Sequence, residues 1–199
     1  MSVLLREFIG LNYDKKQITE LKEKKVPIIV AGVLQRADAL NQNKRIYPRR
    51  VLEREVENYK KAVMEGRAAG ELDHPDSSIV SLENISHIVR EIWWDGNDVC
   101  GKVEILNTPK GRIAQELMES GVQLGISSRG VGETMKNESG ADVVDESFLL
   151  VCFDLVSEPS TQGAWMMKES KEVSFSDVKR TLSKADRINR VVNEILRGK

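Results

Sequence analysis

The chain has 199 residues, of which 40% are hydrophobic, enough for one ordinary core. Its 31 acidic and 30 basic side chains nearly cancel, so no overall field draws it to nucleic acid or to an anionic membrane. No apolar run is long enough for a membrane span or a signal peptide, and Cys100 and Cys152 have no disulfide-like spacing. We therefore expect a soluble, intracellular protein.

The first half of the chain predicts a leader, a strand and a helix. Residues 1–25 are strongly charged with only weak helical periodicity, so we predict a detachable, weakly structured leader before a main domain over 26–166. An apolar, partly β-branched run predicts a strand over 27–34, and a polar loop over 41–47 follows. Pro48 suits the first turn of a helix. That helix has one apolar face at helical spacing: Leu52, Val56, Tyr59 and Val63.

The middle of the chain predicts a turn and a β-hairpin. His74 lies in the turn after the helix, where Pro75 favours an extended backbone for the residue before it. Two strand-like runs, over 85–94 and 99–106, enclose the turn 95–98, which is typical of a hairpin.

The last part of the main domain predicts one helix and several strands. Residues 109–120 predict a short helix, and Gly121 ends it. Strand-like runs follow over 122–129, 142–146 and 148–156. Many short strands and few helices, without βαβ alternation, indicate an α+β fold: a small, mostly antiparallel β-barrel flanked by helices.

The chain changes character after Pro159, and residues 167–199 predict a charged, amphipathic helical tail. Its apolar positions recur at helical spacing: Val178, Leu182, Ala185, Ile188, Val192 and Ile195. This pattern is typical of a helix that docks on a partner or on a second copy of the chain.

The stretch 125–130, GISSRG, contains the candidate nucleophile. A serine hydroxyl attacks a carbonyl only when a neighbouring base removes its proton. Alternation along an extended segment places Ser128 on the same face as the apolar Leu124 and Ile126. Ser127 lies on the other face and is the favoured nucleophile. The alternative is an ordinary Ser-Ser turn after a strand.

Two histidines compete for the role of general base. His74 is favoured because a turn with glycine, proline and short polar residues can project an imidazole into a groove. His87 lies in a predicted strand among apolar residues, where a neutral, hydrogen-bonded imidazole is expected. The alternative for His74 is a surface or capping role.

Asp154 interrupts an otherwise apolar strand, so its carboxylate is expected to be at least partly buried and to need a partner. Such a group can orient a catalytic imidazole and stabilise its cation. The alternative is a structural ion pair with an arginine or lysine elsewhere in the chain.

Metal and phosphate sites find little support in the sequence. The histidines, cysteines and nearby aspartates lack the paired spacings of zinc ligands, so we predict no metal and no cofactor. Four cations cluster around the predicted helix start: Lys44, Arg45, Arg49 and Arg50. We prefer a subsite that recognises an acidic group, and the alternative is a solvated helix start. Interleaved aromatics that would indicate nucleic-acid binding are absent.

Four ordered blocks resemble the prohead core proteases of contractile-tailed bacteriophages, distant relatives of the herpesvirus maturation proteases. They lie between about Pro27 and Trp165: 43–48 (NKRIYP), 70–75 (GELDHP), 93–99 (WWDGNDV) and 125–130 (GISSRG). The resemblance implies that His74 is the general base and Ser127 the nucleophile. Herpesvirus relatives use a second histidine on a late strand, and this chain has Asp154 at the corresponding place.

The resemblance also implies a herpesvirus-protease-like fold and a serine endopeptidase that cleaves phage scaffold, core and major capsid proteins after Glu in L/I-x-E contexts. It would act inside the assembling prohead, in the host cytoplasm, with possible self-association and without nucleic acid, membrane or cofactor. Backbone amides of Ser128, Arg129 and Gly130 are expected to stabilise the oxyanion, helped by the Arg129 charge. The alternative is a non-enzymatic scaffold or tube-like assembly component.

The family pattern further implies self-cleavage, beginning in the leader. Three tripeptides match there: Leu5-Arg6-Glu7, Ile18-Thr19-Glu20 and Leu21-Lys22-Glu23. A weakly structured leader would fit the groove of a protease in extended form. Leu117-Met118-Glu119 also matches but lies in a predicted helix, so we expect it to be cut late, as inactivation.

Overall fold

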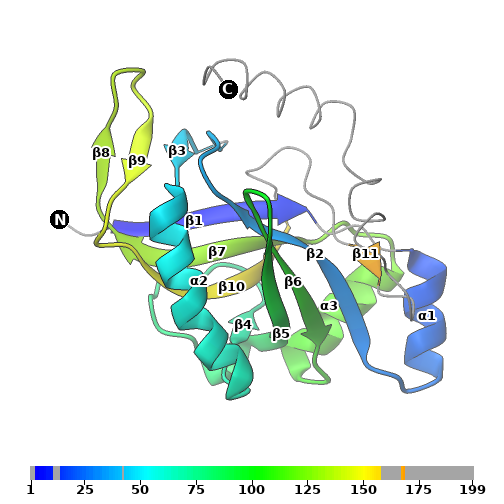
Figure 1. Ribbon diagram of the computed structural model, residues 1–199. Helices are drawn as coiled ribbons and strands as arrows, with labels where there is room; N and C mark the ends of the chain where they lie inside the picture. Colours follow the sequence, from blue (N-terminus) through cyan, green and yellow to red (C-terminus); the bar gives the residue numbers. More distant parts are fainter. Residues whose placement is uncertain (1–2, 11–13, 42, 158–166, 169–199) are drawn as a thin grey trace.

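A computed structural model describes residues 3–10, 14–41, 43–157 and 167–168 (Figure 1). Along the chain the elements are β1 (Val3–Gly10), α1 (Lys15–Glu23), β2 (Ile28–Arg36), β3 (Arg45–Ile46), α2 (Arg49–Met64), β4 (Ala69–Glu71), a 3-10 turn η1 (Leu82–Asn84), β5 (Ile85–Asp95), β6 (Asp98–Ile105), α3 (Pro109–Glu119), β7 (Gly125–Gly132), β8 (Thr134–Lys136), β9 (Asp142–Val144), β10 (Leu149–Val156) and β11 (Met167–Lys168). The predicted α+β class is confirmed.

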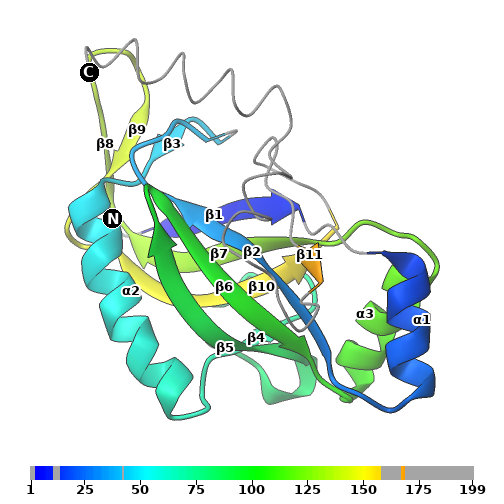
Figure 2. The same cartoon turned by 45° about the vertical axis from the view of Figure 1, so that its right-hand side comes forward.

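The strands form three sheets. The largest has the order β11-β2-β6-β5-β4, the second has the order β1-β7-β10, and both are antiparallel. The third, β3-β9-β8, includes one parallel pair. Figure 2 shows β2, β6 and β5 crossing in front of β7 and β10. A bridge between Leu72 and Leu155 joins the two larger sheets at one edge. Because each sheet of the described strands has an open order, the closed barrel stays a prediction.

Apolar side chains from the two larger sheets and from the helices make one continuous core. Its members include Val30 on β2, Val103 on β6, Ile126 on β7 and Leu155 on β10, all fully buried. Burying a side chain of this size contributes about 1.5–3 kcal/mol. The strand that holds the candidate nucleophile is therefore fixed by packing on its apolar face.

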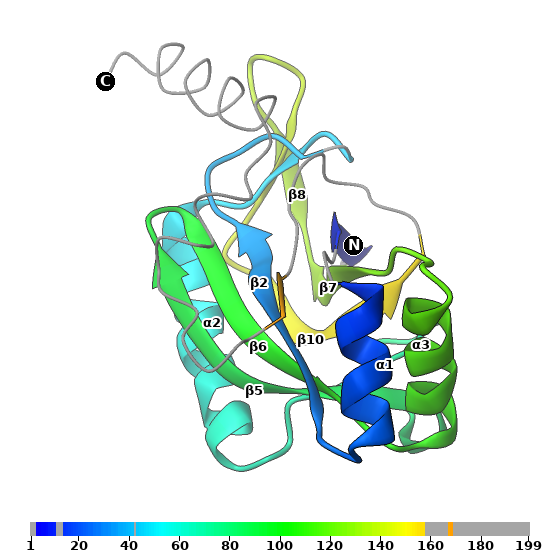
Figure 3. The ribbon, with the colours of Figure 1, turned by 90° about the vertical axis from the view of Figure 1, so that its right-hand side faces the viewer.

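The N-terminal segment is more ordered than the sequence indicated. β1 pairs with β7 along its full length, from Val3 opposite Gly132 to Gly10 opposite Gly125. The helix α1 packs beside α3 (Figure 3). The prediction of weak structure is therefore wrong for Val3–Gly10 and Lys15–Glu23, because β7 and α3, about a hundred residues away, stabilise them, and the detachable leader stays a prediction.

Two contacts anchor α1. Ile18 is fully buried in the core, and Lys22 Nζ contacts the carboxylates of Glu116 and Glu119, the second at 2.6 Å. Asp14 caps the helix by accepting a hydrogen bond from Lys16 N at 2.9 Å. The buried Ile18, the partly buried Leu21 and the Lys22 ion pairs thus hold a helix whose other residues are mostly polar.

Several boundaries differ from the expected ones. The strand expected over 122–129 runs instead from Gly125 to Gly132, so Ser128 to Gly130 all lie inside β7. Met167–Lys168, assigned to the tail, pairs with β2. The predicted helical stripe over 178–195 lies outside the described residues. In the part of the chain that the structure describes, no helix is long and apolar enough to cross a membrane.

Candidate active site

Three segments bring a serine, a histidine and an aspartate into one hydrogen-bonded row. His74 Nε2 lies 2.7 Å from Ser127 Oγ, and His74 Nδ1 lies 2.9 Å from Asp154 Oδ2. Ser127 and Asp154 are register partners on the neighbouring strands β7 and β10. An ionised carboxylate only accepts, so Nδ1 donates to Asp154 and Nε2 is left to accept from the Ser127 hydroxyl.

The turn that carries His74 is held against β10. The N–H of Asp73 donates to the Leu155 carbonyl at 2.6 Å, and its carboxylate accepts from His74 N at 2.9 Å. Asp73 has φ +70°, a left-handed conformation that Asp tolerates better than most residues. These contacts fix the backbone from which the imidazole projects.

Gly70 allows β4 to approach β10 closely. A Cβ added there would lie 1.9 Å from the Phe153 carbonyl oxygen and 2.4 Å from His87 Nε2. Both distances are far inside van der Waals contact. Only glycine lets this strand lie near enough to β10 for the following turn to reach Asp154.

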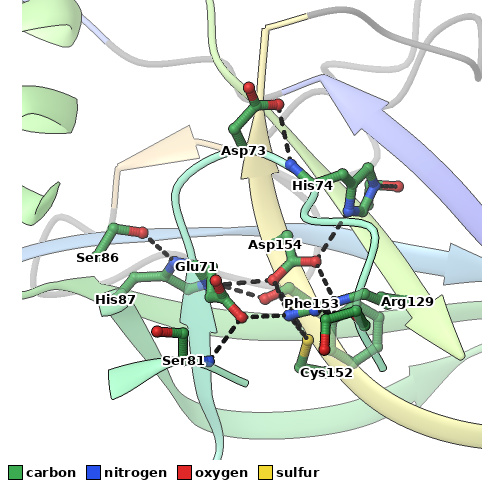
Figure 4. Close-up of polar contacts among 12 residues, drawn as sticks. Glu71, Asp73, His74, Ser81, Ser86, His87, Arg129, Cys152, Phe153 and Asp154 are labelled. Carbon is green, nitrogen blue, oxygen red and sulfur yellow. Dashed lines mark hydrogen bonds and ion pairs between the residues drawn. The ribbon is translucent and has the colours of Figure 1, made fainter. Parts of the chain in front are cut away.

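Asp154 is fully buried and has several donors (Figure 4). Arg129 Nη2 donates to its Oδ1 at 3.1 Å, and the N–H of Glu71 donates to the same oxygen at 3.0 Å. Arg129 Nε lies 2.8 Å from Oδ2, an ion-pair contact without good hydrogen-bond alignment. The expectation that this carboxylate is buried and paired is confirmed.

The pKa of Asp154 is lowered. Burial works in the opposite direction, but the hydrogen bond from His74, the charge of Arg129 and the N–H of Glu71 together outweigh it. Asp154 is therefore ionised at neutral pH, as an acceptor for His74 must be.

Glu71 is a second carboxylate of this cluster that sequence reasoning missed. It is fully buried, and its Oε1 lies 2.8 Å from Arg129 Nη2 and accepts from Ser81 N at 2.9 Å. The same guanidinium donates through Nη1 to the Ser77 carbonyl at 2.6 Å. Glu71 stands in the GELDHP block, but only the fold shows that a buried arginine needs it.

The charge of Arg129 is paired within the buried cluster. Its guanidinium is fully buried between Asp154 and Glu71, where it pairs with both carboxylates. These contacts hold the acid in place, and help to the oxyanion from the Arg129 charge stays a prediction.

The neighbours of Ser127 along β7 have structural contacts of their own. Ser128 Oγ accepts from Gln35 Nε2 at 3.2 Å on the other face of the strand. A Cβ on Gly130 would lie 2.4 Å from the Phe148 ring. Since β7 pairs with β1 and β10 at its two edges, the backbone amides of this segment belong to β-ladders.

His87 is buried and has neutral partners. Its Nε2 donates to the Phe153 carbonyl at 2.9 Å, and its Nδ1 accepts from the Ser86 hydroxyl at 2.8 Å. Burial lowers the pKa of His87 to about 4, although Asp154 and the Phe153 carbonyl act to raise it. The expectation of a neutral, hydrogen-bonded imidazole is confirmed. No group of three His, Cys, Asp or Glu side chains suited to a metal ion occurs among the described residues.

The four predicted basic residues lie around β3 and the start of α2. Arg49 stacks over the Trp94 ring, 3.7 Å from its centroid, and pairs with Glu53 at 2.6 Å. Arg50 pairs with Glu146 at 2.8 Å. Lys44 is exposed and Arg45 is half-buried. The contacts of Arg49 and Arg50 are thus with side chains outside the serine, histidine and aspartate row.

The candidate nucleophile is covered. Ser127 is only 1% exposed, whereas the His74 side chain is 14% exposed. A substrate from another molecule therefore has almost no access to Ser127 in this arrangement.

Comparisons with known proteins agree with this chemistry. Residues 12–178 match the family described as prohead core protein serine protease. A curated relative, the prohead core protein protease of Enterobacteria phage T4, is 33% identical over 164 residues, which cover 80% of this chain and 76% of the relative. The solved structure of the bacteriophage T4 capsid assembly protease superposes with a TM-score of 0.68 at 28% identity, covering 79% of this chain and 99% of that one.

Proposed function

The chain belongs to the prohead core protein serine protease family, and from this premise we propose that Ser127, His74 and Asp154 are its catalytic triad. It is a serine protease of phage prohead maturation. The observation that carries the residue assignment is the unbroken row of hydrogen bonds, 2.7 Å from Ser127 to His74 and 2.9 Å from His74 to Asp154.

In this proposal Ser127 Oγ attacks the substrate carbonyl carbon while its proton passes to His74 Nε2. Asp154 stabilises the resulting imidazolium through Nδ1. His74 then gives the proton to the leaving amine. A water molecule, activated by His74 as general base, next hydrolyses the acyl-enzyme, and the proton returns to Ser127 Oγ. Backbone N–H groups of Ser128 to Gly130 are the proposed donors to the oxyanion. These N–H groups would become available where a backbone hydrogen bond between β7 and a neighbouring strand is broken.

For the substrates we propose phage scaffold, core and major capsid proteins, cut after Glu in L/I-x-E contexts inside the prohead, in the host cytoplasm. The similarity to the T4 prohead core protein protease and to the T4 capsid assembly protease supports the setting. Lys44, Arg45, Arg49 and Arg50 remain the proposed subsite for the glutamate. Arg49 and Arg50 would have to exchange Glu53 and Glu146 for the substrate carboxylate.

We further propose that the strands form a small barrel like that of the herpesvirus proteases. The bridge between Leu72 and Leu155, which joins the two larger sheets at one edge, supports it. The rival proposal, a non-enzymatic assembly component, has the weaker support because the family is a peptidase family.

The test is peptide cleavage by the purified chain after it has been left to process itself. We expect a peptide with an L-x-E segment to be cut after Glu, its Gln counterpart to be cut much more slowly, and Ser127→Ala to cut neither. Equal cleavage of both peptides would contradict the specificity. Equal cleavage by Ser127→Ala would contradict the mechanism.

A further inference from the structure

The register of β1 on β7 places a match to the substrate pattern beside the candidate nucleophile. In this antiparallel pair Phe8 lies opposite Ser127 and Glu7 lies opposite Ser128. The peptide unit that joins Glu7 to Phe8 therefore lies alongside the one that joins Ser127 to Ser128. Glu7 ends Leu5-Arg6-Glu7, the only one of the three N-terminal matches that is in a strand.

The other two matches have the wrong backbone for cleavage. Ile18-Thr19-Glu20 and Leu21-Lys22-Glu23 both lie in α1, and the Glu20 carbonyl accepts from Lys24 N at 3.1 Å. A peptide that binds by adding a strand must be extended. Cleavage after Glu20 or Glu23 would first require the helix, with its buried Ile18, to unwind.

β1 also occupies the strand edge next to the nucleophile. β7 has β10 at one edge and β1 at the other, in the order β1-β7-β10 (Figure 1). Ser127 is 1% exposed in this arrangement. Any other extended segment that pairs with the same edge of β7 must displace β1.

We propose that the edge of β7 that faces β1 is the substrate-binding edge. It takes an extended L-x-E segment antiparallel to β7, with the glutamate opposite Ser128, and β1 is its first, intramolecular occupant. This inference rests on the proposed function, because it needs Ser127 as the nucleophile and cleavage after glutamate. It adds the place, direction and register of the substrate.

The step that follows is an ordinary hydrolysis within one chain. Ser127 Oγ forms a bond to the Glu7 carbonyl carbon, and its proton moves to His74 Nε2. The Glu7–Phe8 bond breaks, and His74 gives the proton to the Phe8 nitrogen. Water then cleaves the ester, which leaves the Glu7 carboxylate and restores the Ser127 hydroxyl. Residues 1–7 lose their covalent link, and β7 regains a free edge for substrates in trans.

The experiment follows the full chain over time by mass spectrometry, at several protein concentrations, together with turnover of an L-x-E peptide. We expect a new terminus at Phe8 with a half-time that does not depend on protein concentration. Peptide turnover should show a lag of the same length. Ser127→Ala incubated with a little mature wild-type protein should be cut slowly, because its β1 is already paired in its own sheet.

Glu7→Gln and Glu7→Lys should give no Phe8 terminus and should hold peptide turnover about tenfold or more below that of the mature wild type, because the competent state is rarely populated while β1 stays in place. Glu20→Gln and Glu23→Gln are the matched controls, since their sites lie in α1, and should behave as wild type.

Two results would overturn the inference alone: a wild-type chain that turns over the peptide without a lag while Glu7–Phe8 stays intact, or Glu7 variants that match the wild type. A wild-type chain that cuts neither itself nor the peptide would overturn the proposed function, and this inference with it.

Discussion

The two histidines occupy contrasting surroundings on the same side of β10. His74 projects from a turn and lies between a hydroxyl and a buried carboxylate, whereas His87 lies inside the core between a hydroxyl and a backbone carbonyl. His87 is held neutral, with a pKa of about 4. The difference teaches that an ionised partner at Nδ1, which can stabilise the imidazolium, separates a base from a structural histidine.

The largest expected loss of activity comes from removing the proposed nucleophile or the proposed base. Ser127→Ala and His74→Ala should each lower peptide turnover on the order of 10⁵-fold, because members of a triad act as a unit. Ser128→Ala should cost far less, since its hydroxyl pairs with Gln35 on the other face of β7. Turnover measured on folded variants checks this. A dead Ser128→Ala beside a normal Ser127→Ala would reverse the assignment.

The next largest loss of activity is expected from neutralising Asp154, the ionised partner of His74. Asp154→Asn should lower turnover about 10⁴-fold at neutral pH, because an amide can hold the imidazole in the wrong tautomer and cannot stabilise its cation. Thermal unfolding should show that the variant still folds. Turnover at the wild-type rate would mean that Asp154 is structural and that the comparison of the two histidines rests on the wrong acid.

Arg129 sharpens the comparison, because it acts on His74 only through Asp154. Arg129→Lys loses the planar fork that contacts both Asp154 and Glu71, and we expect turnover to fall about 10- to 100-fold through misplacement of the acid. Since the Arg129 charge lowers the pKa of Asp154, weaker pairing should raise that pKa. The acid limb of the pH–turnover profile should then move to higher pH.

Arg36→Lys is the matched control for this variant. Arg36 forms a comparable contact with Asp98, Nε to Oδ1 at 2.6 Å, on β2 and β6. Its substitution should leave the pH–turnover profile unchanged. If the pH–turnover profile shifts equally in Arg129→Lys and Arg36→Lys, or in neither, the proposed positioning role of Arg129 is contradicted.

The smallest effect concerns stability, and it belongs to His87. Its folded pKa of about 4 lies below the ordinary value of 6.5, so the unfolded chain takes up a proton first as pH falls. The free energy of unfolding should therefore decrease between pH 6.5 and about 4, by about 3 kcal/mol, and this contribution should level off below that.

Urea unfolding in the Ser127→Ala background, where the chain cannot cut itself, measures this slope. His87→Gln does not titrate and should reduce the slope in that window, even if its stability at neutral pH is lower. An unchanged slope would mean that other groups cause the acid sensitivity.

Local patterns were enough for the elements that are defined by their own periodicity or turn residues. The helix α2, the hairpin β5–β6, the helix α3 and the strand β10 all follow from apolar spacing, capping and turn signals. The buried state of Asp154 could also be predicted, because one carboxylate in an apolar strand has few other places to lie.

Long-range pairing was beyond such patterns. β1 is stabilised by β7, more than a hundred positions later, and its short apolar run, interrupted by Arg6 and Glu7, does not reveal that pairing. The same holds for Glu71, whose burial makes sense only once Arg129 lies beside it. The strand that carries Ser127 was expected to end at Arg129, whereas pairing on both edges continues it through Gly132.

The central claim is that His74, and not His87, activates Ser127. It is tested most directly by labelling the self-processed protein with a serine-reactive phosphonate that carries a glutamate side chain, followed by peptide mapping. The account predicts one adduct on Ser127 in the wild type and in His87→Gln, and none in His74→Ala. An adduct on Ser128, or equal labelling of Ser127 in His74→Ala, would contradict it.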